Sequence, residues 1–294
     1  MKKKRQASFY ILIQQSFNKY FIWIIFLPAS KVKLKIMDQL FSIMLLQGLL
    51  LSCNDKSAPS SVFINIKNTT FINPYTQIKK IPLPDGFERE AADSGSFINY
   101  LRNIELKEQT TVYLFNGNPK SNQSAQYALL NISVGNKDLQ QCADAVMRLR
   151  AEYLFAQKQF DQIVFYDNDK TAYKFSSPFT RNNFTKYLNR VFGMCGSASL
   201  SKQLKPVINF ANILPGDVII RGGFPGHAVI VMDFAVNAAG VKIYLLAQSY
   251  MPAQDIHVLK NPISEDLSPW YVVNDNNIIK TPEYTFTKNE LKRW

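Results

Sequence analysis

Residues 215–233 read PGDVIIRGGFPGHAVIVMD, and this stretch decides the fold that we expect. It holds a short run over 217–220 that is apolar from Val218 onward, a glycine-rich connection, and a second run over 228–234 that follows His227 and is apolar except for Asp233. Short apolar runs bounded by glycine and proline are typical of buried strands. The sequence therefore predicts two neighbouring strands, the second of which opens on a histidine.

Further elements are expected on either side of this stretch. The clearest is a helix over residues 138–157, with Asp138 as its N-cap and Gln141 three residues later in a pattern like a capping box. A third strand is expected over 241–248. Helices followed by strands in this order predict an α+β domain with a mostly antiparallel sheet. Shorter elements are expected as helices over 96–102 (with Ser96 or Ser94 as cap) and 184–192, and as strands over 62–66, 111–115 and 128–134.

A cysteine and a histidine are the candidates for chemistry. Cys142 falls in the first turn of the expected helix, where unpaired N–H groups and the helix dipole favour a thiolate. His227 is one of only two histidines in the chain, and a neighbouring imidazole is another way to activate a cysteine. The same cysteine has apolar neighbours at helical spacing, and that pattern is also typical of a core residue.

This arrangement resembles the papain-like NlpC-type cysteine peptidases and amidases. In that family a cysteine opens a helix, a histidine opens a strand, and a third polar group on the following strand orients the imidazole. The matching third residue here is Gln248. The resemblance implies a papain-like core, with a helix packed on a mostly antiparallel sheet, and catalysis by Cys142, His227 and Gln248. The Cys142 N–H, with the side chain of Gln140 or Gln141, would stabilise the oxyanion.

The sequence departs from the peptidase pattern around its cysteine. Gln141 stands where NlpC-type enzymes usually have Asp, and residues 143–144 are Ala-Asp in place of a Ser-Gly pair. The third position also has rivals, because Gln254 and Asp255 lie in the turn that follows the third strand. These departures leave the catalytic assignment open.

The other cysteine and the other histidine allow further readings. Cys195 lies in a turn after the 184–192 helix, and it is a rival nucleophile. It is also a candidate disulfide partner of Cys142 in an oxidising compartment. His257 lies in an alternating, strand-like run, which indicates a structural role.

A second resemblance is longer and narrower. Residues 81–294 are similar to a bacterial lipoprotein family known as domain of unknown function 4846. The phrases that carry it are LPDGF at 83–87, DLQQCADAVMRLRAEYL at 138–154, GHAVIVMD at 226–233 and AQSYMPAQDIHVLKNP at 247–262. This family has no assigned activity, so the resemblance adds a fold family and an envelope location without naming a reaction.

The N-terminal region reads as an export signal. Residues 40–51 form an apolar run of the length of a signal-peptide core, and Leu50-Leu51-Ser52-Cys53 resembles a bacterial lipobox. The resemblance implies cleavage before Cys53 and a lipid on its sulfur, which anchors the protein to the envelope membrane, with the outer membrane expected. We therefore expect a leader over 1–52. Either this leader is unusually long, or the translation start has been placed too far upstream and residues 1–36 are not part of the protein. A tether over 53–72 and a single papain-like domain over 73–294 follow.

Much of the net charge of +12 comes from this N-terminal region. Eight of the 34 Lys and Arg residues, and no acid, fall within residues 1–36, which leaves 26 basic and 21 acidic residues from Cys53 onward. The remaining excess forms no long basic stretch, so a nucleic-acid partner is excluded on this reading. Two histidines and two non-lipidated cysteines match no standard zinc spacing, and no cofactor or metal is expected.

Three functions remain compatible with these patterns. The first is a lipid-anchored, papain-like cysteine hydrolase that cleaves an amide bond in a peptide or cell-wall peptide. The second is a papain-like binding module whose cysteine is unreactive. The third is a structural lipoprotein of the envelope in which the cysteine and histidine similarity is accidental.

Overall fold

The computed structural model describes residues 12–16, 19–23 and 72–294. The chain divides into a unit over Met1–Ile66 and a unit over Lys67–Trp294. In the first unit, β1 (Leu12–Ser16) pairs antiparallel with β2 (Lys19–Trp23). The lipobox with Cys53 and the expected strand over 62–66 lie outside the described residues. None of the helices within the described ranges is long and apolar enough to cross a membrane.

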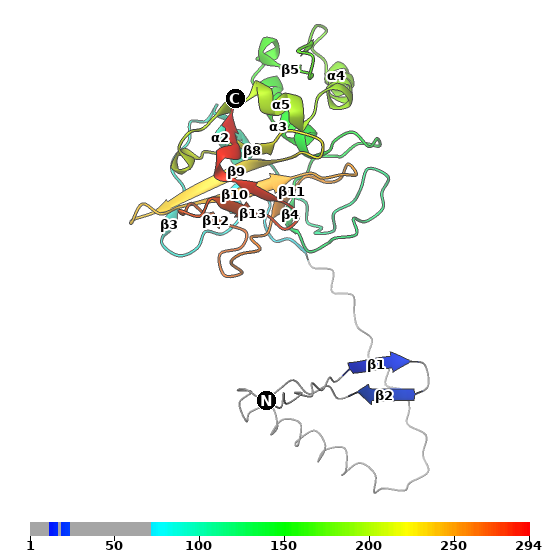
Figure 1. Ribbon diagram of the computed structural model, residues 1–294. Coiled ribbons are helices and arrows are strands. Elements are labelled where there is room, and N and C mark those ends of the chain that lie inside the picture. Colours follow the sequence, from blue (N-terminus) through cyan, green and yellow to red (C-terminus); the bar gives the residue numbers. More distant parts are fainter. Residues whose placement is uncertain (1–11, 17–18, 24–71) are drawn as a thin grey trace, which may run out of the picture. The chain divides into compact units, whose positions relative to one another are not determined.

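One large antiparallel sheet organises the second unit (Figure 1). Among the described residues its order is β4-β11-β10-β9-β8-β15-β7, with β12 beside β10 and β3 beside β9. The sheet strands are β3 (Phe87–Glu88), β4 (Gln126–Leu129), β7 (Lys205–Pro206), β8 (Val218–Arg221), β9 (His227–Asn237), β10 (Lys242–Gln248), β11 (His257–Leu259), β12 (Tyr271–Val272) and β15 (Leu291–Arg293). Within residues 72–294, two hairpins lie outside this sheet: β5 (Val164–Tyr166) with β6 (Ala172–Lys174), and β13 (Ile278–Lys280) with β14 (Thr285–Thr287).

Helices cover one side of the central strands (Figure 1). Helix α3 packs on β9 and β10, α2 also packs on β9, and α5 packs on β8. The helices are α2 (Phe97–Arg102), α3 (Cys142–Ala156), α4 (Arg181–Met194) and α5 (Ser197–Gln203), with short 3₁₀ turns η1 (Ile78–Lys80), η2 (Phe160–Gln162), η3 (Phe210–Asn212) and η4 (Lys288–Glu290). The prediction of an α+β domain with a mostly antiparallel sheet is confirmed at this level.

The core consists of two layers, one on each face of the sheet. In β9 the side chains of Ala228 and Ile230 join the helix-side cluster, whereas those of Val229 and Val231 join the cluster on the opposite face. The first nine residues of β9 are all buried, because both faces of this strand are covered. The strand therefore reads as a continuous apolar run, and this is the signal that the sequence carries at 228–234.

The long helix begins later than expected, and Asp138 is not its N-cap. Helix α3 starts at Cys142, and the N-cap is Gln141, whose backbone N–H donates to Asp144 Oδ2 at 3.0 Å. One oxygen of Asp138 accepts instead from the Gln141 side chain at 3.1 Å and from the backbone N–H of Ala253 at 2.7 Å. The carboxylate therefore ties the start of the helix to the loop after β10, and Cys142 is the first residue of the helix.

Two expected strands are shorter or less regular than predicted. The segment over 111–115 forms only isolated bridges, because the backbone N–H of Val112 donates to the side chain of Gln123 at 3.0 Å and the chain turns back at Asn116-Gly117. Strand β4 starts at Gln126 and ends at Leu129. The predicted helix over 96–102 is confirmed, and Ser96 Oγ caps it by accepting from Asn99 N at 3.1 Å.

Candidate active site

Cys142 lies at the N-terminus of α3, against the start of β9. Its side chain is buried, and the sulfur faces the backbone N–H groups of Ala143 and Ala228 as well as its own. Burial, reinforced by the nearby Asp144 carboxylate, raises the pKa of the thiol to about 11 despite these three donors. The thiol is therefore neutral at physiological pH, and a base is needed to make it nucleophilic. Because Ala228 directly follows His227, the chain brings Cys142 beside the strand end that carries the histidine.

His227 is the first residue of β9, where it pairs with Arg221 of β8. Its Nε2 lies 2.9 Å from Oε1 of Gln248, at the end of β10. The ring contacts Tyr250 and Tyr284, with centroid distances of 4.7 and 4.9 Å. Burial lowers the pKa of His227 to about 4, so the imidazole is neutral. The predicted pairing of His227 with Gln248 is thus present in the structure.

The amide of Gln248 is held in one orientation by Glu283. Gln248 Nε2 donates to Glu283 Oε2 at 2.8 Å, and a carboxylate can only accept. The same carboxylate is held by Lys120 Nζ at 2.5 Å and by Asn122 Nδ2 at 3.0 Å. Gln248 Oε1 must therefore face His227, so Nε2 of the imidazole carries the proton and Nδ1 carries the free lone pair. The result is a neutral tautomer with its basic nitrogen at Nδ1.

Sequence reasoning missed Glu283 and Lys120. Each is an ordinary charged residue in a connecting segment, and they stand 35 and 128 positions from Gln248 in the chain. No motif marks either residue. Only the fold brings them to the end of β10, where Lys120 is buried and the side chain of Glu283 is mostly buried.

Two of the rival residues, Asp255 and Cys195, are engaged elsewhere. Asp255 accepts from Lys107 Nζ at 2.8 Å and from the backbone N–H of Tyr113 at 2.9 Å, so its carboxylate anchors a loop. The backbone carbonyl of Gln254 accepts from Ser249 Oγ at 2.9 Å, while the Nε2 of its side chain is buried with no hydrogen-bond partner among the described residues. Cys195 is the C-cap of α4, where burial raises its pKa to about 12. Both Cys142 and Cys195 are free thiols, so the alternative of a disulfide between them is wrong for this structure.

The glutamines near Cys142 differ in what they do. The Gln141 side chain donates to Asp138, and Gln140 Oε1 accepts from the guanidinium of Arg148. The resemblance implies the Cys142 N–H and a Gln140 or Gln141 side chain as oxyanion donors. Of these groups, the backbone N–H of Cys142, at the start of α3, is the one that interacts with the Cys142 sulfur.

Gly226, the residue before His227, is tightly packed. A Cβ at this position would lie 2.2 Å from Ser197 Oγ and 2.7 Å from the carbonyl oxygens of Arg221 and Gly223. Its backbone therefore approaches α5 and its own loop too closely for any side chain, and the close approach is to these groups. This packing fixes where β9 begins and hence where His227 lies.

His257 belongs to the same buried network and supports it structurally. It pairs with Gln248 across β10 and β11, its Nδ1 lies 2.9 Å from the Asp255 carbonyl oxygen, and its Nε2 lies 3.5 Å from Gln248 Nε2. The ring is completely buried, and burial lowers its pKa to about 4.

The two buried histidines predict acid sensitivity. Each has a folded-state pKa below the ordinary value of 6.5, so the unfolded chain binds more protons below that pH. The free energy of unfolding should therefore fall as the pH drops from about 6.5 to about 4, by on the order of 3 kcal/mol per histidine. Urea unfolding at a series of pH values measures this, and His257→Gln should make the decline shallower. An unchanged slope in that variant would contradict the assignment of the decline to His257.

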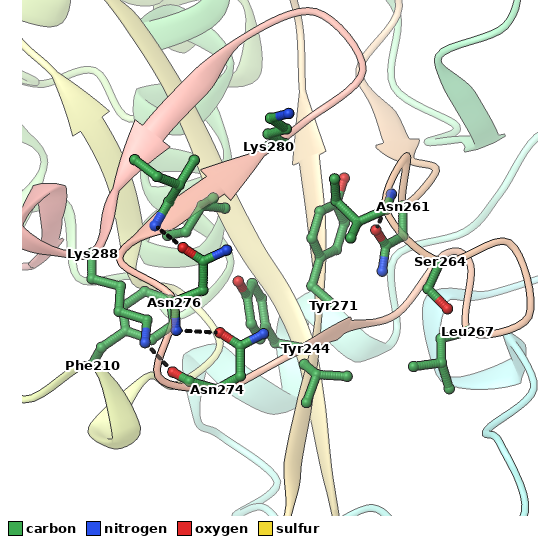
Figure 2. Close-up of a pocket in the computed structure, with 14 residues that line it drawn as sticks. Phe210, Tyr244, Asn261, Ser264, Leu267, Tyr271, Asn274, Asn276, Lys280 and Lys288 are labelled. Atoms are coloured by element: carbon green, nitrogen blue, oxygen red, sulfur yellow. Dashed lines mark hydrogen bonds between the residues drawn. The ribbon is translucent and has the colours of Figure 1, made fainter. Parts of the chain in front are cut away.

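A separate hollow lies away from this site, beside the core cluster on the face of the sheet opposite the helices (Figure 2). It is about 420 Å³ in volume, and Tyr244 and Tyr271 contribute to its wall. Asn274 Oδ1 accepts from the backbone of Asn276 at 3.0 Å, and its carbonyl accepts from Lys288. Among the described residues, its lining includes no cysteine, histidine or carboxylate. It therefore contains none of the candidate catalytic residues Cys142, His227 and Gln248.

The comparison with known protein families gives one match. Residues 78–180 and 168–293 match the family described as domain of unknown function 4846 (DUF4846). These overlapping stretches cover more than half of the chain. The chain belongs to the DUF4846 family. The matched region of this DUF4846 domain includes Cys142, His227, Gln248 and Glu283. No curated protein and no solved structure matches the chain.

Proposed function

We propose that this DUF4846 protein is a papain-like cysteine hydrolase that cleaves an amide bond in a peptide or cell-wall peptide. The observation that carries the proposal is the contact between His227 Nε2 and Gln248 Oε1, at 2.9 Å, beside the helix N-terminus that bears Cys142. A cysteine, a histidine and an amide that orients the histidine are the three parts of a thiol-dependent amide hydrolase.

The proposed reaction assigns one task to each residue. His227 Nδ1 takes the proton of the Cys142 thiol, and the sulfur attacks the carbonyl carbon of the substrate. The backbone N–H of Cys142 donates to the developing oxyanion. When the C–N bond breaks, His227 returns the proton to the leaving amine. Water then attacks the thioester with His227 as base, which releases the acid and restores the thiol.

Cleavage of defined peptides tests the proposal. The full-length protein is incubated with peptides that represent cell-wall cross-links and with an unrelated peptide, and mass spectrometry detects new amine and acid products. We expect cleavage of at least one cell-wall peptide, with a transient acyl group on the tryptic peptide that contains Cys142. A complete absence of cleavage and of acylation would refute hydrolysis of this substrate class.

A non-catalytic binding module is the second candidate, and one observation favours it. Burial holds the Cys142 thiol neutral, with a pKa of about 11. A binding module would leave this thiol unlabelled by iodoacetamide at pH 7, whether or not peptides are present. A hydrolase should label at Cys142 faster as the pH rises, and peptide substrate should protect it.

Glu283 is proposed as a positioning residue for the same reaction. In Glu283→Gln an amide replaces the acceptor-only carboxylate, so the side chain of Gln248 is free to rotate away from His227. A hydrogen bond to a charged group contributes about 1.5–3 kcal/mol, so kcat should fall about 10- to 100-fold with little change in KM. Because the negative charge of Glu283 raises the pKa of His227, its removal should also move the acid limb of the pH–rate profile to lower pH.

Glu290→Gln is the matched control for this substitution. Glu290 is also paired with a cation, since Arg221 Nε donates to it at 2.5 Å, but it does not contact Gln248. Its variant should keep the kcat and the pH profile of the parent. Equal losses in both variants would mean that Glu283 acts only through stability.

We also propose that the protein is anchored to the bacterial envelope by a lipid on Cys53. The support is the sequence alone: an apolar run over 40–51 followed by Leu-Ser-Cys, and then a polar segment suited to a tether. In Cys53→Ser cells the protein should move from the membrane fraction to the soluble fraction, and it should no longer incorporate labelled palmitate. Membrane association that persists in this variant would contradict the lipid anchor.

A further inference from the structure

The hollow of Figure 2 lies on the face of the sheet opposite the helices. Its volume is about 420 Å³. The sheet contributes Tyr244 from β10 and Tyr271 from β12, and two connecting segments, over 261–267 and 274–280, contribute most of the remaining wall. Because Cys142 does not line it, the hollow is separate from the site proposed for hydrolysis.

Tyr244 presents an unpaired hydroxyl to this hollow. The residue is only 2 % exposed, and its hydroxyl makes no hydrogen bond within the described part of the chain, yet the oxygen is not among the fully enclosed polar atoms. Burial raises the pKa of Tyr244, so the hydroxyl stays protonated and can donate. The hydroxyl of Tyr271, in contrast, donates to the Lys260 carbonyl oxygen at 2.6 Å. A nearly buried hydroxyl without a partner usually marks a missing one.

Two asparagine amides add open donors. The backbone N–H groups of Asn276 and Ile278 donate to Oδ1 of Asn274 and of Asn276 respectively, each at 3.0 Å. The oxygen of each amide is therefore engaged, and Nδ2 is the end that remains available. Both asparagines are exposed and both line the hollow, so these donors are accessible to a ligand.

Contacts between the lining residues gather these donors on one side of the hollow. Lys288 Nζ donates to the carbonyl oxygen of Asn274 and lies 5.5 Å from the centre of the Phe210 ring. That ring lies 5.8 Å from the ring of Tyr244, and Asn276 is bonded to Asn274. Figure 2 shows Lys288, Asn274, Asn276 and Tyr244 on the side of the hollow where Phe210 lies.

The charged lining is positive. Lys280 and Lys288 line the hollow, whereas no carboxylate of the described residues does. Lys288 donates to a carbonyl oxygen, so its charge has no counter-charge there. An ammonium, two amide N–H groups and a hydroxyl all donate, and this set of groups suits the oxygens of an anion.

The rest of the lining is apolar. It includes Ile263, Leu267, Val272 and Ile278. Ile263 is 67 % exposed and Ile278 is 43 % exposed, so two large apolar side chains stand open to water at the same hollow. Apolar walls with a few polar groups that fix the orientation are typical of sites for small organic ligands.

We propose that this hollow binds a small organic carboxylate with an apolar body, whose oxygens accept from Lys288, from the hydroxyl of Tyr244 and from the two asparagine amides. The single charge of a carboxylate matches the one ammonium that lies beside these donors. The apolar body then covers Ile263 and Ile278. The inference does not depend on amide hydrolysis.

Titration calorimetry of the full-length protein with hydrocinnamate tests the proposal. Hydrocinnamate should bind, and hydrocinnamamide, which has the same shape without the charge, should bind at least about tenfold more weakly. Acetate, which has the charge without the apolar body, should also bind more weakly. The proposal is overturned if hydrocinnamate does not bind at millimolar concentration, or if the amide or acetate binds as tightly. Tighter binding of inorganic phosphate than of hydrocinnamate would overturn the assignment to a carboxylate.

Two variants locate the binding in the hollow. Tyr244→Phe removes only the hydroxyl, which contacts no described residue, so the melting temperature should not fall. The affinity for hydrocinnamate should nevertheless fall about tenfold, because a hydrogen bond to a charged group is lost. Lys288→Gln removes the ammonium and should weaken binding by at least as much, even if the first variant misfolds. Parent-like affinity in either folded variant would refute the location.

Tyr166→Phe and Lys174→Gln are the matched controls. They make the same chemical changes on β5 and β6, and neither residue lines the hollow. Both controls should bind hydrocinnamate as the parent does. Losses as large as those of Tyr244→Phe and Lys288→Gln would mean that the acid does not bind in this hollow.

Discussion

Cys142→Ala should remove the proposed amide cleavage while the protein stays folded, and Cys195→Ala should leave that cleavage unchanged. The alanine has no sulfur to attack the carbonyl, and a nucleophile lost from such a constellation typically costs about 10⁴-fold or more in kcat. The loss of stability should be small, because only one buried sulfur atom is removed and alanine is favourable within a helix.

Cys195 is the matched control because it is the other free and buried cysteine of the described residues. Its substitution removes the same atom from a similar environment, at the C-terminal end of α4, away from His227 and Gln248. Rates of peptide cleavage and melting temperatures of both variants measure the two effects separately. If Cys142→Ala still cleaves a peptide that the parent cleaves, or if Cys195→Ala alone is inactive, the assignment of the nucleophile is wrong.

Asp233→Ala should produce the largest loss of stability. Asp233 is completely buried in β9, and its two oxygens accept from Arg89 Nε and Arg102 Nε, each at 2.6 Å. Arg102 is itself nearly buried and also donates to the carbonyl oxygen of Glu90. The carboxylate thus locks the segment over 81–102 onto the sheet.

Removal of Asp233 leaves two guanidinium groups without their counter-charge, and one of them has almost no access to water. Breaking a buried ion pair in this way costs about 3–5 kcal/mol. Urea unfolding measures the loss, with Asp266→Ala as the control because Asp266 is exposed. A loss below about 1 kcal/mol would show that the two arginines are solvated once the carboxylate is gone.

Local sequence patterns predicted the helices and strands whose formation does not depend on contacts between distant parts of the chain. The strands at 217–220, 228–234 and 241–248 were recognisable because both faces of the sheet are covered, which makes each strand an apolar run of its own. The helix over 96–102 was recognisable from its Ser96 cap. Where long-range hydrogen bonds compete, the same patterns misled: Asp138 looks like an N-cap, but Ala253 and Gln141 take its oxygen.

The candidate site was predictable only in part. The resemblance to NlpC-type peptidases implied that the side chains of His227 and Gln248 meet, and they do, at 2.9 Å. The orientation of that amide was not predictable, because it depends on Glu283 and Lys120, which come from distant loops. The neutral state of Cys142 was not predictable either, since the helix N-terminus favours a thiolate and burial outweighs it.

Local sequence patterns were enough to predict the α+β class, the strand that opens on His227 and the placement of Cys142 in the first turn of a helix, because periodicity and glycine act over a few residues. The pairing of His227 with Gln248 was implied by the resemblance to NlpC-type peptidases. The tautomer of His227, the pKa of Cys142 and the unpaired hydroxyl of Tyr244 could be found only from the folded chain. Hydrogen bonding and desolvation depend on groups that are remote in the chain, so they are decided only when the fold brings those groups together.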